Sequence, residues 1–117
     1  MKLVHYTDIE SIQADVLGHS GAKGLSIRFV LGHGDGAPNF AMMVIDLMPE
    51  GNTPEHQHAW EEALFVTSGR GEIRTEDRRT GIKPGDVIYI TPEETHQFVN
   101  TGVEPLEMVC VVPRVTI

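Results

Sequence analysis

The sequence contains little cysteine and few basic residues. Its 117 residues include one cysteine, Cys110, so the chain can form no internal disulfide and has no set of thiolates for a zinc site. Nine Lys and Arg against 17 Asp and Glu give a formal net charge of −8, whereas phosphate-rich partners attract basic surfaces. We therefore expect a reducing compartment, no nucleic-acid partner and no membrane partner.

Long hydrophobic runs and targeting segments are also missing. No stretch approaches the roughly 18 apolar residues that span a bilayer, and residues 1–6 lack the apolar core of a secretory signal. With 40% apolar and 22% charged residues, the chain has the composition of a folded domain rather than of a disordered segment. We expect one soluble, cytoplasmic domain.

Glycine and proline are spread along the whole chain and indicate a fold made of strands. The 12 glycines and 7 prolines leave no room for helices between most of them. Turn signals about every ten residues are typical of an all-β sandwich or barrel. Only residues 11–17 offer a weak helical turn. The expected strands, rich in β-branched and aromatic residues, are 25–31, 40–48, 63–67, 71–75, 86–91, 96–100 and 106–112.

Alternation of apolar and polar residues indicates which side chains of these strands face a core. In the first strand, Ser26 and Arg28 are expected to point outward. The expected inward set comprises Leu25, Ile27, Phe29, Leu106, Met108, Cys110 and Val112. The segment 40–47 is apolar on both faces, which favours an additional contact with a second sheet or subunit.

Residue types that bind metals gather in the segment 51–62. His56 and His58 are two residues apart, so in an extended strand both imidazoles face the same side. A short turn brings the carboxylate of Glu62 beside them, and His96, on a later strand, offers a fourth donor. Three imidazoles and one carboxylate suit Fe(II), Mn(II), Ni(II), Cu(II) or Zn(II). Taken alone, the His-x-His pair favours two exposed strand histidines over a metal site, and both interpretations are open at this point.

The spacing of these residues resembles the two sequence motifs of the cupin superfamily. In that family the first motif reads G-x(5)-H-x-H-x(3,4)-E-x(6)-G and the second reads G-x(5)-P-x-G-x(2)-H-x(3)-N. The matching residues in this chain are His56, His58, Glu62, Gly69, Gly85, His96 and Asn100. The chain departs from the pattern at turn positions, since Gly51 is one residue closer to His56, Thr91 replaces the proline and Glu93 replaces the second glycine.

This resemblance implies a single cupin domain over residues 1–117. The implied fold is all-β, a jelly-roll barrel or double-stranded β-helix of two antiparallel sheets. The motif barrel would cover about residues 40–113, and the N-terminal strands, about 1–39, would associate with the partner in a homodimer. The implied metal ligands are His56, His58, Glu62 and His96.

Four further residues are candidates for the pocket around this site. Trp60 is expected either to cap the mouth of the site or to pack in the motif turn. Tyr89 and Phe98 fit a pocket wall, although core packing is the commoner role of such residues. Cys110 fits an inert buried thiol, the commoner role, or else a redox-active residue or one that acts behind the metal ligands. Glu61 alternates to the opposite face from Glu62, which favours a solvated or interface carboxylate.

The resemblance leaves the reaction open, because one fold supports many functions. The first hypothesis is a metal-dependent enzyme, dioxygenase- or oxidase-like, or an isomerase, acting on a small organic molecule. In this hypothesis the metal acts as Lewis acid and template. The alternative is a non-catalytic module that binds or senses a small molecule through the same metal. A purely structural metal is a third interpretation. The sequence identifies no catalytic general base.

Overall fold

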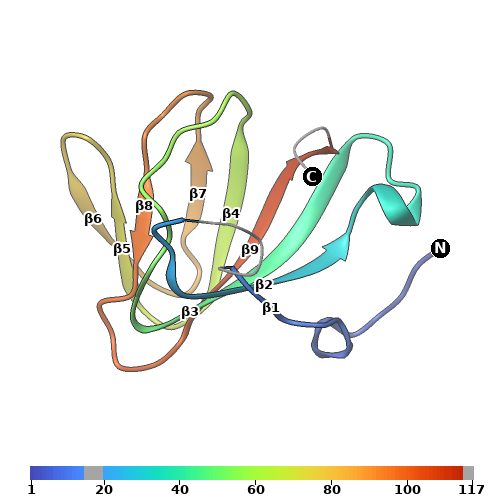
Figure 1. Ribbon diagram of the computed structural model, residues 1–117, viewed down its shortest axis with the longest axis horizontal. Coiled ribbons are helices and arrows are strands. Elements are labelled where there is room, and N and C mark those ends of the chain that lie inside the picture. Colours follow the sequence, from blue (N-terminus) through green and yellow to red (C-terminus); the bar gives the residue numbers. More distant parts are fainter. Residues whose placement is uncertain (15–19, 115–117) are drawn as a thin grey trace.

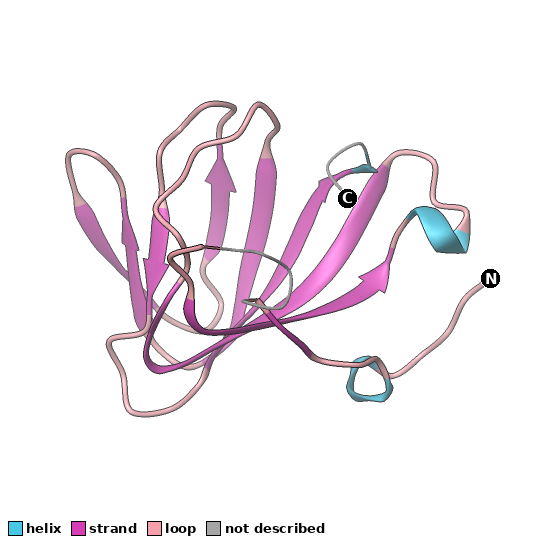
Figure 2. Cartoon of the chain, in the orientation of Figure 1, coloured by secondary structure: helices cyan, strands magenta, loops and turns pink. Residues whose placement is uncertain are grey.

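The computed structural model describes residues 1–14 and 20–114, and strands make up most of it (Figures 1 and 2). Within these residues no helix has the length and apolar character needed to cross a membrane. The elements in chain order are η1 (Tyr6–Asp8), β1 (Ile12–Gln13), β2 (Lys23–Leu31), η2 (His33–Asp35), β3 (Phe40–Asn52), β4 (Glu62–Ser68), β5 (Gly71–Arg74), β6 (Arg79–Ile82), β7 (Val87–Ile90), β8 (Gln97–Val99) and β9 (Leu106–Pro113); η1 and η2 are short 3-10 turns.

Strand β3 is the longest strand and joins the two halves of the sheet. The strand order is β6-β5-β8-β3-β9-β4-β7, with β2 paired to β3 and β1 paired to β2. All these pairings are antiparallel. Strand β3 pairs with β9 from Phe40 to Leu47 and reaches β8 only where Asn52 lies opposite Val99. The all-β, antiparallel prediction is confirmed, and the sheet curls into two halves joined through β3 (Figure 1).

The inward-facing residues expected from alternation form the core. Leu25 and Ile27 are each 6% exposed, and the four expected residues of β9 are at most 4% exposed. They cluster with buried residues of β3 and β4, among them Leu47, Leu64 and Val66. Arg28 points to the other face, as expected, where its guanidinium donates to the backbone carbonyls of Thr7 and Ile9. One core therefore serves both halves of the sheet.

Two short strands escaped the sequence analysis. The helical turn expected over 11–17 is wrong at Ile12 and Gln13, which pair with β2, while residues 15–17 lie outside the described residues. Strand β6 has the sequence Arg-Thr-Gly-Ile and buries only Ile82. Because β6 is stabilised by its hydrogen bonds to β5 rather than by an apolar pattern, its residues carry no strand signal.

The turn before His96 shows how the chain tolerates a departure from the cupin pattern. Glu93, at the position where that pattern has glycine, adopts a left-handed backbone with φ 66°. This conformation is costly for residues with a Cβ. The backbone N–H of Glu93 donates to the carbonyl of His58 at 2.7 Å, so the turn contributes a direct link between the two motif segments.

Gly69, between β4 and β5, provides a test of the barrel geometry. Its φ is +82°, and an added Cβ would overlap the backbone carbonyl of Pro105. Gly69→Ala should lower the free energy of unfolding by roughly 2–4 kcal/mol, because left-handed strain and overpacking add together. Denaturant titration measures this change. Gly81→Ala is the matched control, since nothing lies within 4 Å of its added Cβ; equal destabilisation of both variants would contradict the prediction.

Candidate metal centre

Three histidines from two distant segments lie side by side. His56 and His58 belong to the connection between β3 and β4, and His96 directly precedes β8. His56 and His96 form an isolated antiparallel bridge, in which each backbone N–H donates to the other's carbonyl, at 3.1 and 2.9 Å. The sequence predicted an extended strand through His56 and His58, whereas the structure has only this single bridge at His56. The bridge brings the imidazoles of His56 and His96 to a centroid distance of 4.7 Å.

Backbone carbonyls orient all three imidazoles in the same way. The Nδ1 atoms of His56, His58 and His96 lie 2.9, 2.8 and 2.8 Å from the carbonyl oxygens of residues 54, 60 and 94. A carbonyl oxygen only accepts, so each Nδ1 carries a proton and each Nε2 faces away from the backbone; in the neutral imidazole this Nε2 has the lone pair that can bind a metal. One ring nitrogen of each histidine lies within 4.8 Å of the other two. The described residues thus contain a three-histidine cluster that could hold a metal ion.

Glu62, the first residue of β4, lies against this cluster. Its Oε1 is 3.3 Å from Nε2 of His58 and 3.5 Å from Nε2 of His96. Its Oε2 accepts a hydrogen bond from the thiol of Cys110 at 2.8 Å. Burial raises the pKa of Glu62, but the hydrogen bonds with His96 and Cys110 outweigh this effect and leave that pKa below its usual value. The carboxylate is therefore anionic at neutral pH.

The histidines of the cluster differ in their affinity for protons. Burial, together with the nearby His96, lowers the pKa of His56. Burial also lowers the pKa of His96, but its hydrogen bonds with Glu62 and with the carbonyl of Glu94 reverse the effect, and the net pKa is raised. His96 is 1% exposed. His96 therefore holds a proton more tightly than an ordinary histidine does, and His56 holds one less tightly.

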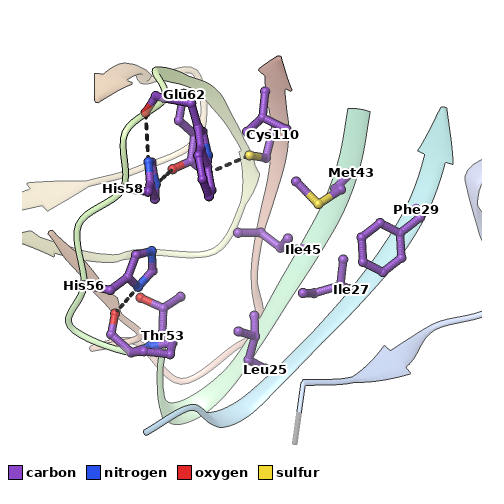
Figure 3. A pocket seen from close by; sticks show the side chains of 13 residues that line it. Leu25, Ile27, Phe29, Met43, Ile45, Thr53, His56, His58, Glu62 and Cys110 are labelled. Atoms are coloured by element: carbon purple, nitrogen blue, oxygen red, sulfur yellow. Dashed lines mark hydrogen bonds and ion pairs between the residues drawn. The ribbon is translucent and has the colours of Figure 1, made fainter. Parts of the chain in front are cut away.

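A cavity of about 360 Å³ opens beside the cluster and is lined by two of its three histidines, His56 and His58. One wall is polar and carries residues of the motif segment and of β9, and the facing wall is apolar and comes from β2 and β3 (Figure 3). The lining residues are Leu25, Ile27, Phe29, Met43, Ile45, Thr53, Pro54, His56, His58, Trp60, Glu62, Cys110 and Val112. A small molecule in this cavity would contact the cluster on one side and hydrocarbon on the other.

Two of the four candidate pocket residues line the cavity. The indole of Trp60 stacks on the imidazole of His58, with ring centroids 4.5 Å apart and planes 5° apart, so it packs in the turn and faces the cavity at once. Cys110 lines the cavity next to Glu62.

The other two candidates do not line it. Tyr89 points outward, is 57% exposed and donates to Glu61 at 2.9 Å, because its strand, β7, alternates that side chain away from the core. Phe98 is 3% exposed and packs in the core, with its ring 6.3 Å from that of His96. A role in the pocket wall is therefore wrong for Tyr89 and for Phe98.

Some residues of the polar wall and of the apolar wall were not predicted from the sequence. Thr53 is 6% exposed, and its hydroxyl accepts the backbone N–H of Phe98 at 2.8 Å. Met43 and Ile45 come from the segment that is apolar on both faces, so alternation alone did not show which of its faces points to the site. Phe29 and Met43 lie opposite each other across β2 and β3. Alternation along β2 did identify the residues that this strand contributes to the apolar wall, which are Leu25, Ile27 and Phe29.

Comparison with known proteins agrees with this geometry. The model of the Cupin domain family matches residues 43–112, which is more than half of the chain. The chain belongs to the cupin family. The curled antiparallel sheet is accordingly a jelly-roll barrel, and the three histidines stand at the histidine positions of the two cupin motifs.

Two solved structures resemble this cupin over most of its length. The polyketide cyclase RemF from Streptomyces resistomycificus is 31% identical, with a TM-score of 0.89 over 97% of this chain and 79% of that chain. A cupin 2 domain-containing protein from Halorhodospira halophila is 30% identical, with a TM-score of 0.71 over 75% of this chain and 62% of that chain.

A curated relative matches a shorter part of this cupin. The uncharacterized protein MJ1618 from Methanocaldococcus jannaschii is 35% identical over 66 residues, which are 55% of this chain and 53% of that protein. The match therefore spans about half the length of this relative.

Removal of one imidazole tests the cluster as a metal site. His58→Ala should weaken Zn(II) binding by more than about 100-fold, since loss of a residue behind the ligands already costs about 10–100-fold. Competition with a chromophoric chelator measures the dissociation constant. His33→Ala is the matched control, because His33 lies exposed in η2, outside the cluster. Equal Zn(II) affinity in the two variants would contradict the assignment.

The pH dependence of metal binding follows from the histidine pKa values. A histidine binds metal through a deprotonated nitrogen, so protons compete with the metal as the pH falls. His96 has a raised pKa, so it is expected to take up a proton first, above the ordinary histidine value of about 6.5. Zn(II) affinity should therefore decrease from neutral to mildly acidic pH, as measured by the same competition at several pH values. A flat profile would count against imidazole ligation.

Proposed function

We propose that this cupin is a metal-dependent enzyme that acts on a small, uncharged and largely apolar organic molecule. The observation that carries the proposal is the cavity of about 360 Å³, which places an apolar wall opposite His56 and His58, two members of the three-histidine cluster. Ligand sites of this kind combine hydrophobic walls with a few polar groups that fix the orientation of the ligand. Here the polar groups are also the proposed metal ligands.

The proposed ligands are His56, His58, His96 and Glu62. The donor set fits a divalent transition metal, because three Nε2 atoms, which bind a metal once their rings are neutral, and one anionic carboxylate oxygen lie close together. Fe, Mn, Ni, Zn and Cu all accept such donors. When bound, the metal would supply a Lewis acid that polarises an oxygen atom of the substrate.

The residues around the cluster define the class of substrate. Among the described residues that line the cavity, Glu62 is the only Asp, Glu, Lys or Arg, so no side-chain cation is present to pair with a carboxylate or phosphate that lies away from the metal. A negative charge directed toward the apolar wall would be buried without a partner, which is costly. The apolar wall, with Ile27, Phe29 and Met43, excludes water from one side of the ligand. The flat indole of Trp60 offers a surface for a planar substrate.

Two reaction types fit this site. Redox-neutral chemistry on a polyketide-like or phenolic molecule is favoured by the likeness to the polyketide cyclase, which extends over 97% of this chain. Dioxygenase- or oxidase-like chemistry is the second candidate, and it is favoured by a donor set that leaves coordination positions free on Fe or Mn. Dependence of turnover on O2 separates the two reaction types.

Turnover by the metal-loaded protein tests the proposal. The protein is loaded anaerobically with Fe(II), Mn(II), Ni(II) or Zn(II) and mixed with uncharged phenols and β-keto esters, and with their carboxylate analogues. Product formation is followed by mass spectrometry and O2 uptake with an electrode. We expect turnover of an uncharged compound with at least one metal. An analogue whose added carboxylate lies away from the atoms that can reach the metal should bind about tenfold more weakly or worse, because that charge would be buried unpaired against the apolar wall.

Controls separate an enzyme from a binding module. His58→Ala should lose turnover and His33→Ala should keep it, since only the former removes a residue of the cluster. Turnover in both variants would place the chemistry elsewhere. Tight binding of an uncharged compound by every metal form, without product, would overturn the enzyme proposal in favour of a non-catalytic binding module.

A further inference from the structure

The thiol of Cys110 is a polar group at the site that the proposed chemistry does not use. Cys110 lies on β9, opposite Leu64 of the neighbouring β4, and is 1% exposed. Its Sγ is 2.8 Å from Oε2 of Glu62, two residues before Leu64 on the same face of β4. The contact is therefore made between two adjacent strands, in the interior of the barrel.

The direction of this hydrogen bond follows from the charges of its two partners. Burial and the negative charge of Glu62 raise the pKa of the Cys110 thiol, so the sulfur keeps its proton. Glu62 has a lowered pKa and is a carboxylate that only accepts. The thiol is thus the donor and Oε2 the acceptor.

Because of this hydrogen bond, the two oxygens of the Glu62 carboxylate have different partners. Rotation about the last torsion of a glutamate is soft and roughly two-fold, so an isolated carboxylate can present either oxygen or neither. Here Oε2 is held by the thiol, while Oε1 lies 3.3 Å from Nε2 of His58 and 3.5 Å from Nε2 of His96. The contacts of Glu62 with the thiol and with His58 are made at the same time in one orientation of the side chain (Figure 3).

We propose that Cys110 is a positioning residue, whose S–H holds Oε2 of Glu62 so that Oε1 faces the imidazole nitrogens and completes the metal site. This inference rests on the proposed metal-dependent function. Residues that orient metal ligands from behind typically change metal affinity by about 10–100-fold when they are removed. An inert buried thiol would affect stability alone, so the two roles of Cys110 give different results.

Metal affinity of four variants tests this role. Cys110→Ala and Cys110→Val lack the donor, and Cys110→Ser retains one. Val66→Ala is the control for a lost core group, because Val66 is 0% exposed on β4 and does not line the cavity. The dissociation constant for Zn(II) is measured by chelator competition at neutral pH, and unfolding by denaturant is measured on the same samples.

We expect Cys110→Ala and Cys110→Val to bind Zn(II) about 10–100-fold more weakly than the wild type. Cys110→Ser should recover most of this loss, and Val66→Ala should bind Zn(II) as the wild type does while being less stable. Wild-type affinity in both Cys110→Ala and Cys110→Val would overturn the inference and leave the metal site intact. Absence of Zn(II) binding by the wild type would instead overturn the proposed function, and the role of Cys110 in metal affinity with it.

Infrared spectroscopy of the metal-free protein tests the contact itself. The chain has a single cysteine, so its S–H stretching band belongs to Cys110, and a hydrogen bond to a carboxylate lowers the frequency of that band. Glu62→Leu should move the band to higher frequency. Glu61→Leu should leave it unchanged, because Glu61 bonds to Tyr89 on the outer face. The same frequency in the wild type and in Glu62→Leu would overturn the inference.

Discussion

The two hydrogen bonds between the backbones of His56 and His96 are the constraint on which the site depends. These residues are 40 positions apart in the sequence, and their bridge is isolated from the named strands. It fixes two imidazoles side by side, and the bond from Glu93 to the carbonyl of His58 ties down the third histidine's segment. Because backbone atoms set this alignment, the side chains facing the cavity can differ without moving the cluster.

The orientation of the imidazoles depends equally on the backbone. Each of the three rings donates to a carbonyl two residues away, before the ring in two cases and after it in the third. Such local bonds fix both the tautomer and the ring plane. The backbone conformation of two loops, β3–β4 and β7–β8, therefore sets the orientation of the three rings. The strands of the barrel hold the ends of these loops.

Much of this arrangement could be predicted from the sequence, and the exceptions have physical causes. Motif spacing identified the histidines, and alternation identified the inward side of β2 and β9. Tyr89 was assigned to the pocket wall by residue type alone, whereas β7 turns its side chain away from the core, in the opposite direction to Ile90. Strand β6 was missed because it is held by pairing with β5 rather than by an apolar pattern. Glu62 as a metal ligand and the homodimer stay predictions.

The stacking of Trp60 on His58 has a consequence for optical experiments. The chain contains one tryptophan, and its indole lies face to face with an imidazole of the cluster at 4.5 Å. The intrinsic fluorescence of the protein therefore originates almost wholly beside the cavity. Emission is sensitive to charge and to excited-state electron transfer at such short range, so the natural chain carries its own optical reporter of events at the histidine cluster.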